Sequence, residues 1–418
     1  MTSVTDIADR AWRGEPTPDY HAFRTAGLSQ ELADGLLYVS GFSNLIALAT
    51  TEGLVLVDTS GTLTAEAAHR ALRDWTDAPV HTVVYTHGHL DHVAGAPRYD
   101  DEALEQGLPA PRVVAHEAVV DRFERYALTA GHNGVINGRQ FGMDDLRWPT
   151  EYRRPDETYR HRLDLDVGGR RLELHHARGE TDDHTWLYLP DQRALCCGDL
   201  FIWASPNAGN PQKVQRFPDE WARALRTMAT YEAEVLLPGH GMPVVGVERV
   251  HEALTSTAAY LESLCEQTLH QMNAGRRLDE IVHEVAPPAE LARRPWLQPT
   301  YDEPEFVVRN LWRLWGGWWD GNPAHLKPAP EADLAVELSD LAGGPAALAV
   351  RARALLEAGE LRLAAHLAEL AVQAAPSEPE LHAVRAEVFE AAAGAATSTM
   401  AKGVYRHAAR ESRTRLGS

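Results

Sequence analysis

Six consecutive residues, His87-Gly88-His89-Leu90-Asp91-His92, restrict what this chain can fold into more than any other feature of its sequence. They place three imidazoles and one carboxylate in a short loop. Residues 81–86 are typical of a buried strand, and strand ends carry side chains to the rim of a sheet, where sites are usually built. Imidazole and carboxylate are the usual ligands of Zn²⁺ and similar ions. We therefore predict a metal site rather than a solvated turn, with enough ligands in the loop to serve two ions.

Length and composition narrow the class of protein. A chain of 418 residues exceeds what one hydrophobic core normally serves, so two or more domains are expected. A net charge of −20 disfavours binding to nucleic acid or to an anionic membrane. Three cysteines, two of them adjacent, form neither a disulfide framework nor a cysteine-type zinc site, and they suit a reducing compartment. Without a secretory signal or an apolar run of about 20 residues, we expect a cytoplasmic protein.

The first part of the sequence alternates short apolar runs with turns and a few helical stretches, which predicts an α/β domain over residues 1–246. Helices are expected at 64–75 and 117–125. Residues 131–160 break this rhythm and are interpreted either as a substrate-covering loop or as an ordinary surface excursion. The expected strands are 36–39, 44–49, 54–58, 82–86, 112–115, 163–167, 171–177, 186–189, 194–197 and 235–238.

Residues 247–418 have a helical character. Four tryptophans between Trp312 and Trp319 indicate a large apolar surface that is buried within the chain or between chains. The Ala/Leu-rich segments near the end pair in the manner of tetratricopeptide hairpins, which usually scaffold contacts. The expected helices are 248–273, 278–285, 346–357, 360–374, 378–393 and 399–412.

Three further ligand candidates follow predicted strands at some distance from the histidine loop. Glu180, Asp199 and His240 each lie beside a glycine, where the backbone can turn toward a metal. A glycine next to an acid is commonplace in turns, so each signal is weak alone. Taken together and in this order, they strengthen the prediction of a metal centre.

With these residues in place, the chain resembles the metallo-β-lactamase superfamily, whose pattern is His-x-His-x-Asp-His followed by Gly-His, Gly-Asp and Gly-His-Gly. The match departs at Glu180, where that superfamily usually has histidine. Alkyl sulfatases related to the dodecyl sulfate hydrolases carry a glutamate there. Residues 267–275, 318–324 and Gly343-Gly344 look like the helical dimerisation domain of those sulfatases.

This resemblance implies an αββα sandwich holding two Zn²⁺ ions, with Mn²⁺ or Fe as alternatives. It implies that the 1–246 domain is catalytic and that residues 247–418 form a homodimer. Asp91 and Asp199 would be the carboxylates essential for catalysis, and Asp58 and His184 would support the ligands. One ion would take His87, His89 and Glu180, the other Asp91, His92 and His240, and Asp199 would bridge them.

Two departures from the sulfatases bear on the substrate. In a gap-free alignment Gln212 falls where they place an arginine that grips sulfate, and no sterol-carrier-like domain follows in this sequence. Lys213 or Arg216 would replace that arginine only with a different geometry. We therefore expect a long-chain detergent to be a poor substrate. The candidate substrate contacts are Tyr126, Arg139, Asn207, Gln212, Lys213 and Arg216.

The expected activity is that of a metal-dependent hydrolase acting on a small-molecule sulfate ester or related ester. Two ions about 3.5–4 Å apart can hold a bridging water, lower its pKa and present hydroxide to the substrate. The alternatives are hydrolysis of a lactone, thioester or β-lactam at the same site, a redox iron protein, and a non-catalytic helical scaffold. Decay to a scaffold is disfavoured because all seven ligand positions hold ligand-type residues.

Overall fold

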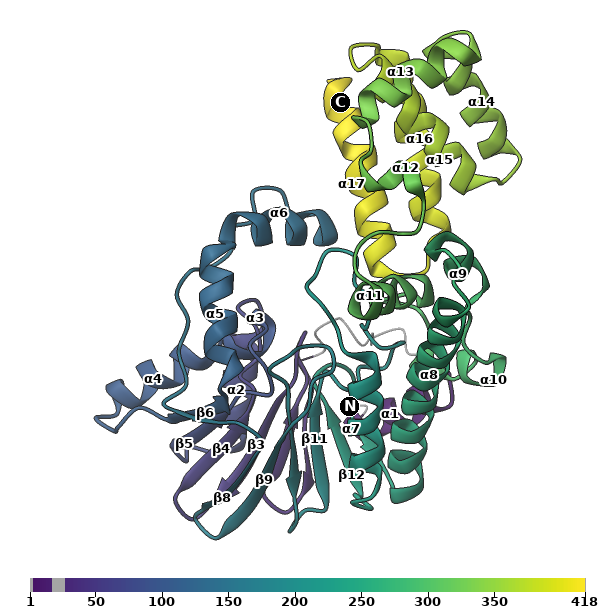
Figure 1. The fold of residues 1–418 in the computed structure, drawn as a ribbon. Helices are drawn as coiled ribbons and strands as arrows, with labels where there is room; N and C mark the ends of the chain where they lie inside the picture. The colour runs from purple at the N-terminus through teal and green to yellow at the C-terminus, as the bar shows by residue number, and fades with distance from the viewer. Residues whose placement is uncertain (1–2, 17–26, 418) are drawn as a thin grey trace. The chain divides into compact units, whose positions relative to one another are not determined.

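The computed structural model of the chain describes residues 3–16 and 27–417 (Figure 1). These residues divide into two compact units. The first unit contains the described residues of Met1–Ala130 together with Pro149–Gly275 and Ile281–Trp315. The second unit contains Gly131–Trp148, Arg276–Glu280 and the described residues of Gly316–Ser418.

The first unit is built on two mixed sheets. In each sheet, parallel strand pairs lie beside antiparallel ones. The first sheet has the order β1-β2-β3-β4-β5-β6-β7, with bounds Ser29–Ala33, Leu36–Val39, Leu45–Thr50, Gly53–Val57, Val80–Val84, Arg112–His116 and Glu157–Tyr159. The second has the order β13-β12-β11-β10-β9-β8, with bounds, from β8 to β13, Arg162–Val167, Arg170–His176, Thr185–Leu189, Ala194–Gly198, Val235–Pro238 and Val244–Val245.

The two sheets pack face to face around one apolar core. Strand β2 shows how the sequence produces this arrangement, because successive side chains of a strand point to opposite faces. Leu36 and Tyr38 belong to the core shared with residues of the second sheet such as Leu174. Leu37 belongs instead to a second core that the first sheet forms with its covering helices.

Helices cover the outer faces of both sheets, which gives four layers in the order αββα (Figure 1). The predicted sandwich is therefore confirmed. The first sheet is covered by α2 (Ala65–Trp75), α4 (Ala96–Glu105) and α5 (Ala118–Leu128), whose apolar side chains share its outer core. Helices α7 (Pro218–Ala229) and α8 (Val247–Asn273) lie beside β11 and β12 in Figure 1. The remaining helices that begin before residue 328 are α1 (Val4–Trp12), α3 (Leu90–Val93), α6 (Ala130–Phe141), α9 (Leu278–Glu284), α10 (Ala289–Ala292), η1 (Pro295–Leu297), α11 (Pro304–Gly316) and α12 (Pro323–Leu326).

The second unit is mainly helical, in agreement with the predicted helical region. Small residues such as Ala352, Ala364 and Ala368 let its helices pack closely around a core completed by leucines and valines. Its long helices are α13 (Glu331–Ala342), α14 (Pro345–Glu357), α15 (Leu361–Ala374), α16 (Pro379–Ala395) and α17 (Thr399–Arg415). Within the described ranges, no helix combines the length and apolar character needed to cross a membrane.

Residues 131–160 differ from the irregular segment that the sequence suggested. Helix α6 (Ala130–Phe141) occupies the first part, and β7 forms near the end. Gly138 of α6 lies against the carbonyl oxygen of Met143, and Gly403 of α17 lies against that of Gln140. Glycine lowers intrinsic helix propensity, so the pattern reads as a loop, but the missing side chains allow these close backbone approaches.

Candidate metal centre

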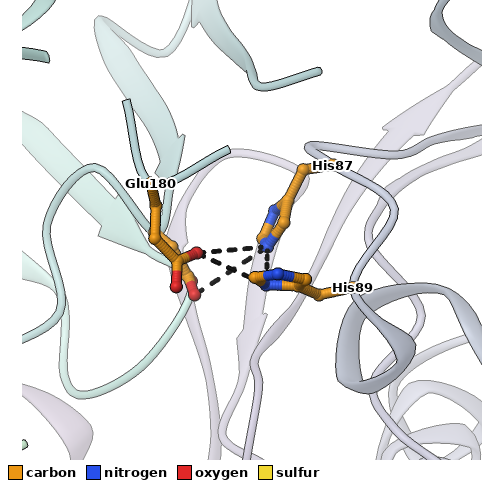
Figure 2. Close-up of side chains that lie close together, drawn as sticks. His87, His89 and Glu180 are labelled. Carbon is orange, nitrogen blue, oxygen red and sulfur yellow. Dashed lines mark hydrogen bonds and ion pairs between the residues drawn. The ribbon is translucent and has the colours of Figure 1, made fainter. Parts of the chain in front are cut away.

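The loop after β5 brings His87 and His89 together with Glu180, which follows β9 (Figure 2). Nε2 of His87 lies 2.8 Å from Nδ1 of His89. Oε2 of Glu180 lies 3.6 Å from His87 Nε2 and 3.4 Å from His89 Nδ1. With Asp199, these residues form a cluster whose potential ligand atoms all lie within 4.8 Å of one another.

Asp91, His92 and His240 form a second cluster of the same compactness. Oδ2 of Asp91 lies 3.4 Å from His240 Nε2 and 3.7 Å from His92 Nε2. Asp199 reaches both clusters. Its Oδ1 lies 3.3 Å from His92 Nε2, while its Oδ2 lies 3.3 Å from His240 Nε2 and 3.9 Å from His87 Nε2. The seven predicted ligands thus lie together, with Asp199 between the two groups.

The donor atoms of both clusters fit divalent metal ions. Among the described residues, His92 Nε2, Glu180 Oε2 and Asp199 Oδ1 are buried yet lack a hydrogen bond of good geometry. A buried polar atom left in this way is costly unless something else satisfies it. All three are ligand atoms that face other ligand atoms. Imidazole nitrogen combined with carboxylate oxygen suits Zn²⁺, Mn²⁺ and Fe.

The hydrogen-bond partner of one ring nitrogen in each histidine determines which nitrogen faces the centre. Nδ1 of His240 donates to the carbonyl oxygen of Phe42, so Nε2 is the ring nitrogen that faces the centre. Nδ1 of His92 donates to Asp58 Oδ2 at 2.7 Å, and Nδ1 of His87 lies 3.0 Å from the hydroxyl of Thr86. Such partners fix the tautomer and orientation of a ligating histidine. Three of the four histidines therefore present Nε2.

Asp58 anchors the histidine loop through its carboxylate. It follows β4 with a φ of 58°, in the left-handed region that aspartate tolerates better than most residues. Its Oδ1 accepts from the backbone N–H of Thr86 at 2.7 Å, and its Oδ2 accepts from the Thr86 hydroxyl at 2.7 Å. The same Oδ2 accepts from His92, so one buried carboxylate holds both ends of the loop.

Charges within the centre favour a cation. Burial lowers the pKa of His87 well below its ordinary value, with help from His92 and His89, so His87 is neutral. Burial also opposes protonation of His92, but Asp199, Asp58 and Asp91 together raise the pKa of His92 well above its ordinary value. A place where carboxylates stabilise a proton is also one where they stabilise a metal cation.

His184, predicted to play a supporting role, lies behind the centre. Its ring stacks on that of His87 with centroids 4.9 Å apart, and its Nε2 accepts from the backbone N–H of Asp199 at 3.1 Å. Burial lowers the pKa of His184 to about 4, so the ring is neutral. His184 thereby fixes the backbone of one ligand and the ring plane of another.

A buried ion pair that was not predicted from the sequence supports the same loop. Arg122, on α5, donates from Nε to Asp183 Oδ2 at 2.6 Å, and it also pairs with Asp182. The Asp183 carboxylate accepts from the backbone N–H of Gly88 at 3.0 Å. The two acids immediately before His184 were the signal for this role, but nothing local to Arg122 indicates its partner.

A buried loop after β11 carries most of the predicted substrate contacts. Asn207 donates from its side-chain amide to Glu180 Oε1. Arg216 donates to the backbone oxygen of Glu180, and its Nη2 lies 3.4 Å from Glu180 Oε1. Both side chains therefore hold the candidate ligand Glu180 through atoms other than Oε2, the oxygen nearest to His87 and His89.

The other predicted contacts take different positions. Lys213 is half-buried on the same loop. Burial and Arg216 lower its pKa to about 8, against the opposite effect of Asp91 and Glu180. The backbone N–H of Gln212 donates to Asn210. Tyr126 lies on α5, with the guanidinium of Arg122 5.8 Å from its ring centroid. Arg139 lies on α6, in the second unit.

Comparison with known families agrees with this geometry. The model of the family described as "Metallo-beta-lactamase superfamily" matches residues 39–240, which contain all seven ligand candidates. The model described as "Alkyl sulfatase dimerisation" matches residues 277–415. The chain belongs to the alkyl-sulfatase-like branch of the metallo-beta-lactamase superfamily. The resemblance to the alkyl sulfatases that the sequence motifs indicated is therefore confirmed.

Individual relatives within this branch point the same way. A linear primary-alkylsulfatase from Pseudomonas sp. is 29% identical over 338 residues, which is 75% of this chain and 62% of the relative. An (R)-specific secondary-alkylsulfatase from Pseudomonas sp. is 28% identical over 381 residues, which is 83% of this chain and 56% of the relative. The chain thus spans less than two thirds of the length of these relatives.

A solved structure extends the similarity to the fold. The stereoselective inverting sec-alkylsulfatase Pisa1 from Pseudomonas sp. has a TM-score of 0.83 and 25% identity. The alignment covers 92% of this chain and 65% of that one. The alkyl-sulfatase architecture therefore extends through both units of this chain.

Proposed function

We propose that the chain is a dinuclear metal-dependent hydrolase of sulfate esters of small alcohols. The convergence of seven ligand side chains in two adjoining clusters carries this proposal. The cationic side chains of Lys213 and Arg216, on a loop whose Arg216 contacts the ligand Glu180, favour an anionic substrate. The three relatives described above are alkylsulfatases by name, which favours a sulfate ester.

One ion would be held by His87, His89 and Glu180, the other by Asp91, His92 and His240, with Asp199 shared. When bound, the ions supply Lewis acidity that activates a water molecule and stabilises negative charge on the substrate. Zn²⁺ fits this donor set best, and Mn²⁺ or Fe also fit.

The protein contributes positioning and charge. Asp58, His184 and Asp183 fix the ligands, and Asn207 with Arg216 fixes Glu180. A protein nucleophile is not expected from the cysteines beside the centre. Burial raises the pKa of the Cys196 and Cys197 thiols, so neither forms a thiolate near neutral pH. Direct attack by water follows as the proposed route.

A substrate panel tests the proposed function. The metal-loaded chain should release inorganic sulfate from short primary and secondary alkyl sulfates, measured by ion chromatography. Hydrolysis of lactones, thioesters or β-lactams without sulfate release would favour the second candidate class. Failure to turn over any member of the panel in the metal-loaded state would favour the scaffold interpretation.

We predict two metal ions per chain. Seven candidate ligands exceed what one tetrahedral ion uses, and Asp199 contacts both clusters. Elemental analysis of protein purified without chelator should give about two equivalents. A single equivalent that does not increase after addition of Zn²⁺ or Mn²⁺ would contradict this prediction.

Dodecyl sulfate should be hydrolysed slowly. Gln212 stands at the position aligned with the sulfate-gripping arginine, and an amide lacks the charge-assisted paired hydrogen bonds that arginine gives. Loss of such a bond costs about 1.5–3 kcal/mol, which is roughly tenfold to a hundredfold in rate. Gln212→Arg should raise kcat/KM for dodecyl sulfate by that factor. Rapid hydrolysis by the parent that is lost in Lys213→Ala would show that Lys213 grips the sulfate instead.

We also propose that residues 247–418 mediate a homodimer. Leu334, Leu338 and Leu341 lie on one face of α13 and are 52%, 37% and 84% exposed in the single chain. Trp318 is 70% exposed. Apolar surface of this kind usually marks an interface.

Light scattering at micromolar concentration should therefore give twice the chain mass. The double variant Leu334→Arg/Leu341→Arg should shift the mass toward that of the monomer. Leu104→Arg changes a leucine of similar exposure, 78%, on α4 and should leave the dimer intact. A monomeric parent would contradict the proposed assembly.

A further inference from the structure

Asn310, on α11, pairs with the backbone of Arg216 through both ends of its side-chain amide. Its Oδ1 accepts from the backbone N–H of Arg216 at 3.2 Å, and its Nδ2 donates to the backbone oxygen of Arg216 at 3.1 Å. Asn310 is buried, being 6% exposed. One side chain thereby satisfies both backbone polar groups of Arg216, a buried residue that belongs to no strand or helix.

A second residue of the loop, Gln215, adds further hydrogen bonds between the loop and α11. Nε2 of Gln215 donates to Asn310 Oδ1 at 2.9 Å, and its Oε1 accepts from Arg313 Nε at 2.9 Å. Arg313 lies one helical turn after Asn310 on α11. Residues 215–216 are therefore held by one face of α11.

The start of the same helix, together with Asp302 two residues before it, holds the other part of the loop. The Asp302 carboxylate accepts from the backbone N–H of Gly209 at 2.6 Å, and its backbone oxygen accepts from the Ser205 hydroxyl at 2.9 Å. A Cβ at Gly209 would collide with the backbone of Phe306 and Val307, so the loop lies directly on the start of α11. The loop that contains Asn207 and Arg216 is anchored at two points.

The side chain of Arg216 connects these contacts of Asn310 to the candidate metal centre. Arg216 is 2% exposed, and its side chain donates to the backbone oxygen of Glu180 and lies 3.4 Å from the Glu180 carboxylate. A buried guanidinium must be oriented closely, because its donors are fixed in a plane. Movement of the Arg216 backbone would therefore displace Glu180 relative to His87 and His89.

We propose that Asn310 is a positioning residue that acts through Arg216 to fix Glu180 and so sets the affinity of the cluster His87, His89, Glu180 and Asp199 for its metal ion. This role rests on the proposed metal centre. It assigns part of that centre's function to a helix lying within residues 277–415, the match described as dimerisation.

A double-mutant cycle on metal affinity tests this role without any substrate. Zn²⁺ affinity of the full-length chain would be measured by competition with a chromophoric chelator, for the parent, Asn310→Ala, Arg216→Ala and the double variant. We expect Asn310→Ala to weaken the binding of one Zn²⁺ equivalent about 10–100-fold, as loss of supporting partners usually does. If Asn310 acts through Arg216, the double variant should bind no more weakly than Arg216→Ala alone.

Two variants complete the experiment. Asn310→Asp keeps the acceptor but removes the donation to the Arg216 oxygen, so it should weaken binding even if Asn310→Ala does not fold. Arg309→Ala changes the exposed neighbour on the same helix and should bind Zn²⁺ like the parent. Thermal unfolding with excess chelator reports whether each variant folds.

The outcomes separate this role from the proposed function. Equal Zn²⁺ affinity in the parent and in a folded Asn310 variant, or losses that add in the double variant, would overturn the role of Asn310 alone. A parent chain that binds no metal would overturn both. Weakened binding without any sulfatase activity would support the role of Asn310 while contradicting the proposed substrate.

Discussion

Replacing Asp91 by alanine should lower hydrolytic activity about a thousandfold or more and leave the fold intact. Asp91 supplies the carboxylate of the second cluster, 3.4 Å from His240 Nε2. Its side chain is 30% exposed, so its removal leaves no large void in the core. The loss should therefore fall on metal binding and catalysis rather than on stability.

The test combines kinetics with metal content. Asp91→Ala should show a reduced kcat/KM for the best sulfate ester in the panel and should retain fewer metal equivalents than the parent. Asp101→Ala removes an exposed carboxylate from α4 that belongs to neither cluster, and it serves as the control. Hydrolysis by Asp91→Ala at a rate near the parent's would show that the second cluster does not take part in the reaction.

The largest effect on stability is expected from Asp183→Ala. Arg122 is 1% exposed and loses its buried partner in this variant, while the backbone N–H of Gly88 loses its acceptor. Breaking a buried ion pair from one side leaves an uncompensated charge and costs about 3–5 kcal/mol. We expect the free energy of unfolding of the metal-free chain to fall by this amount.

Its neighbour provides a matched control. Asp182 also pairs with Arg122, but its side chain is 42% exposed, so Asp182→Ala should cost about 1 kcal/mol or less. Denaturant unfolding followed by tryptophan fluorescence would measure both variants. Similar losses in the two variants would mean that the buried pair of Arg122 with Asp183 stabilises the fold no more than the exposed pair of Arg122 with Asp182.

The grouping of the seven candidate ligands could be predicted from sequence because each candidate lies in a short local pattern. His87, His89, Asp91 and His92 lie within six residues, and Asp199 and His240 each follow a strand and a glycine. The alternation of apolar residues also located most strands within two residues of their observed bounds. Such signals are local, and local signals are what a single sequence preserves.

The supporting residues could not be predicted in this way. The pairing of Arg122 with Asp183 joins residues 61 positions apart, and that of Asn310 with Arg216 joins residues 94 positions apart. Helix α6 was not predicted because its glycines are weak helix formers. These glycines are accommodated because they allow close contact with the backbone of other residues. These pairings and this helix depend on contacts between distant parts of the sequence, which the spacing of residues does not predict.

The core between the two sheets has a consequence for how such a centre changes over evolution. Val84, Cys196 and Leu237 share that core, and each lies three residues before a candidate ligand, respectively His87, Asp199 and His240. Tightly packed interiors transmit even a one-methylene change in volume. A substitution at any of the three would alter the gap between the sheets and hence the span between ligands that they carry. Preference for one ion over another can therefore drift through residues that touch neither metal nor substrate.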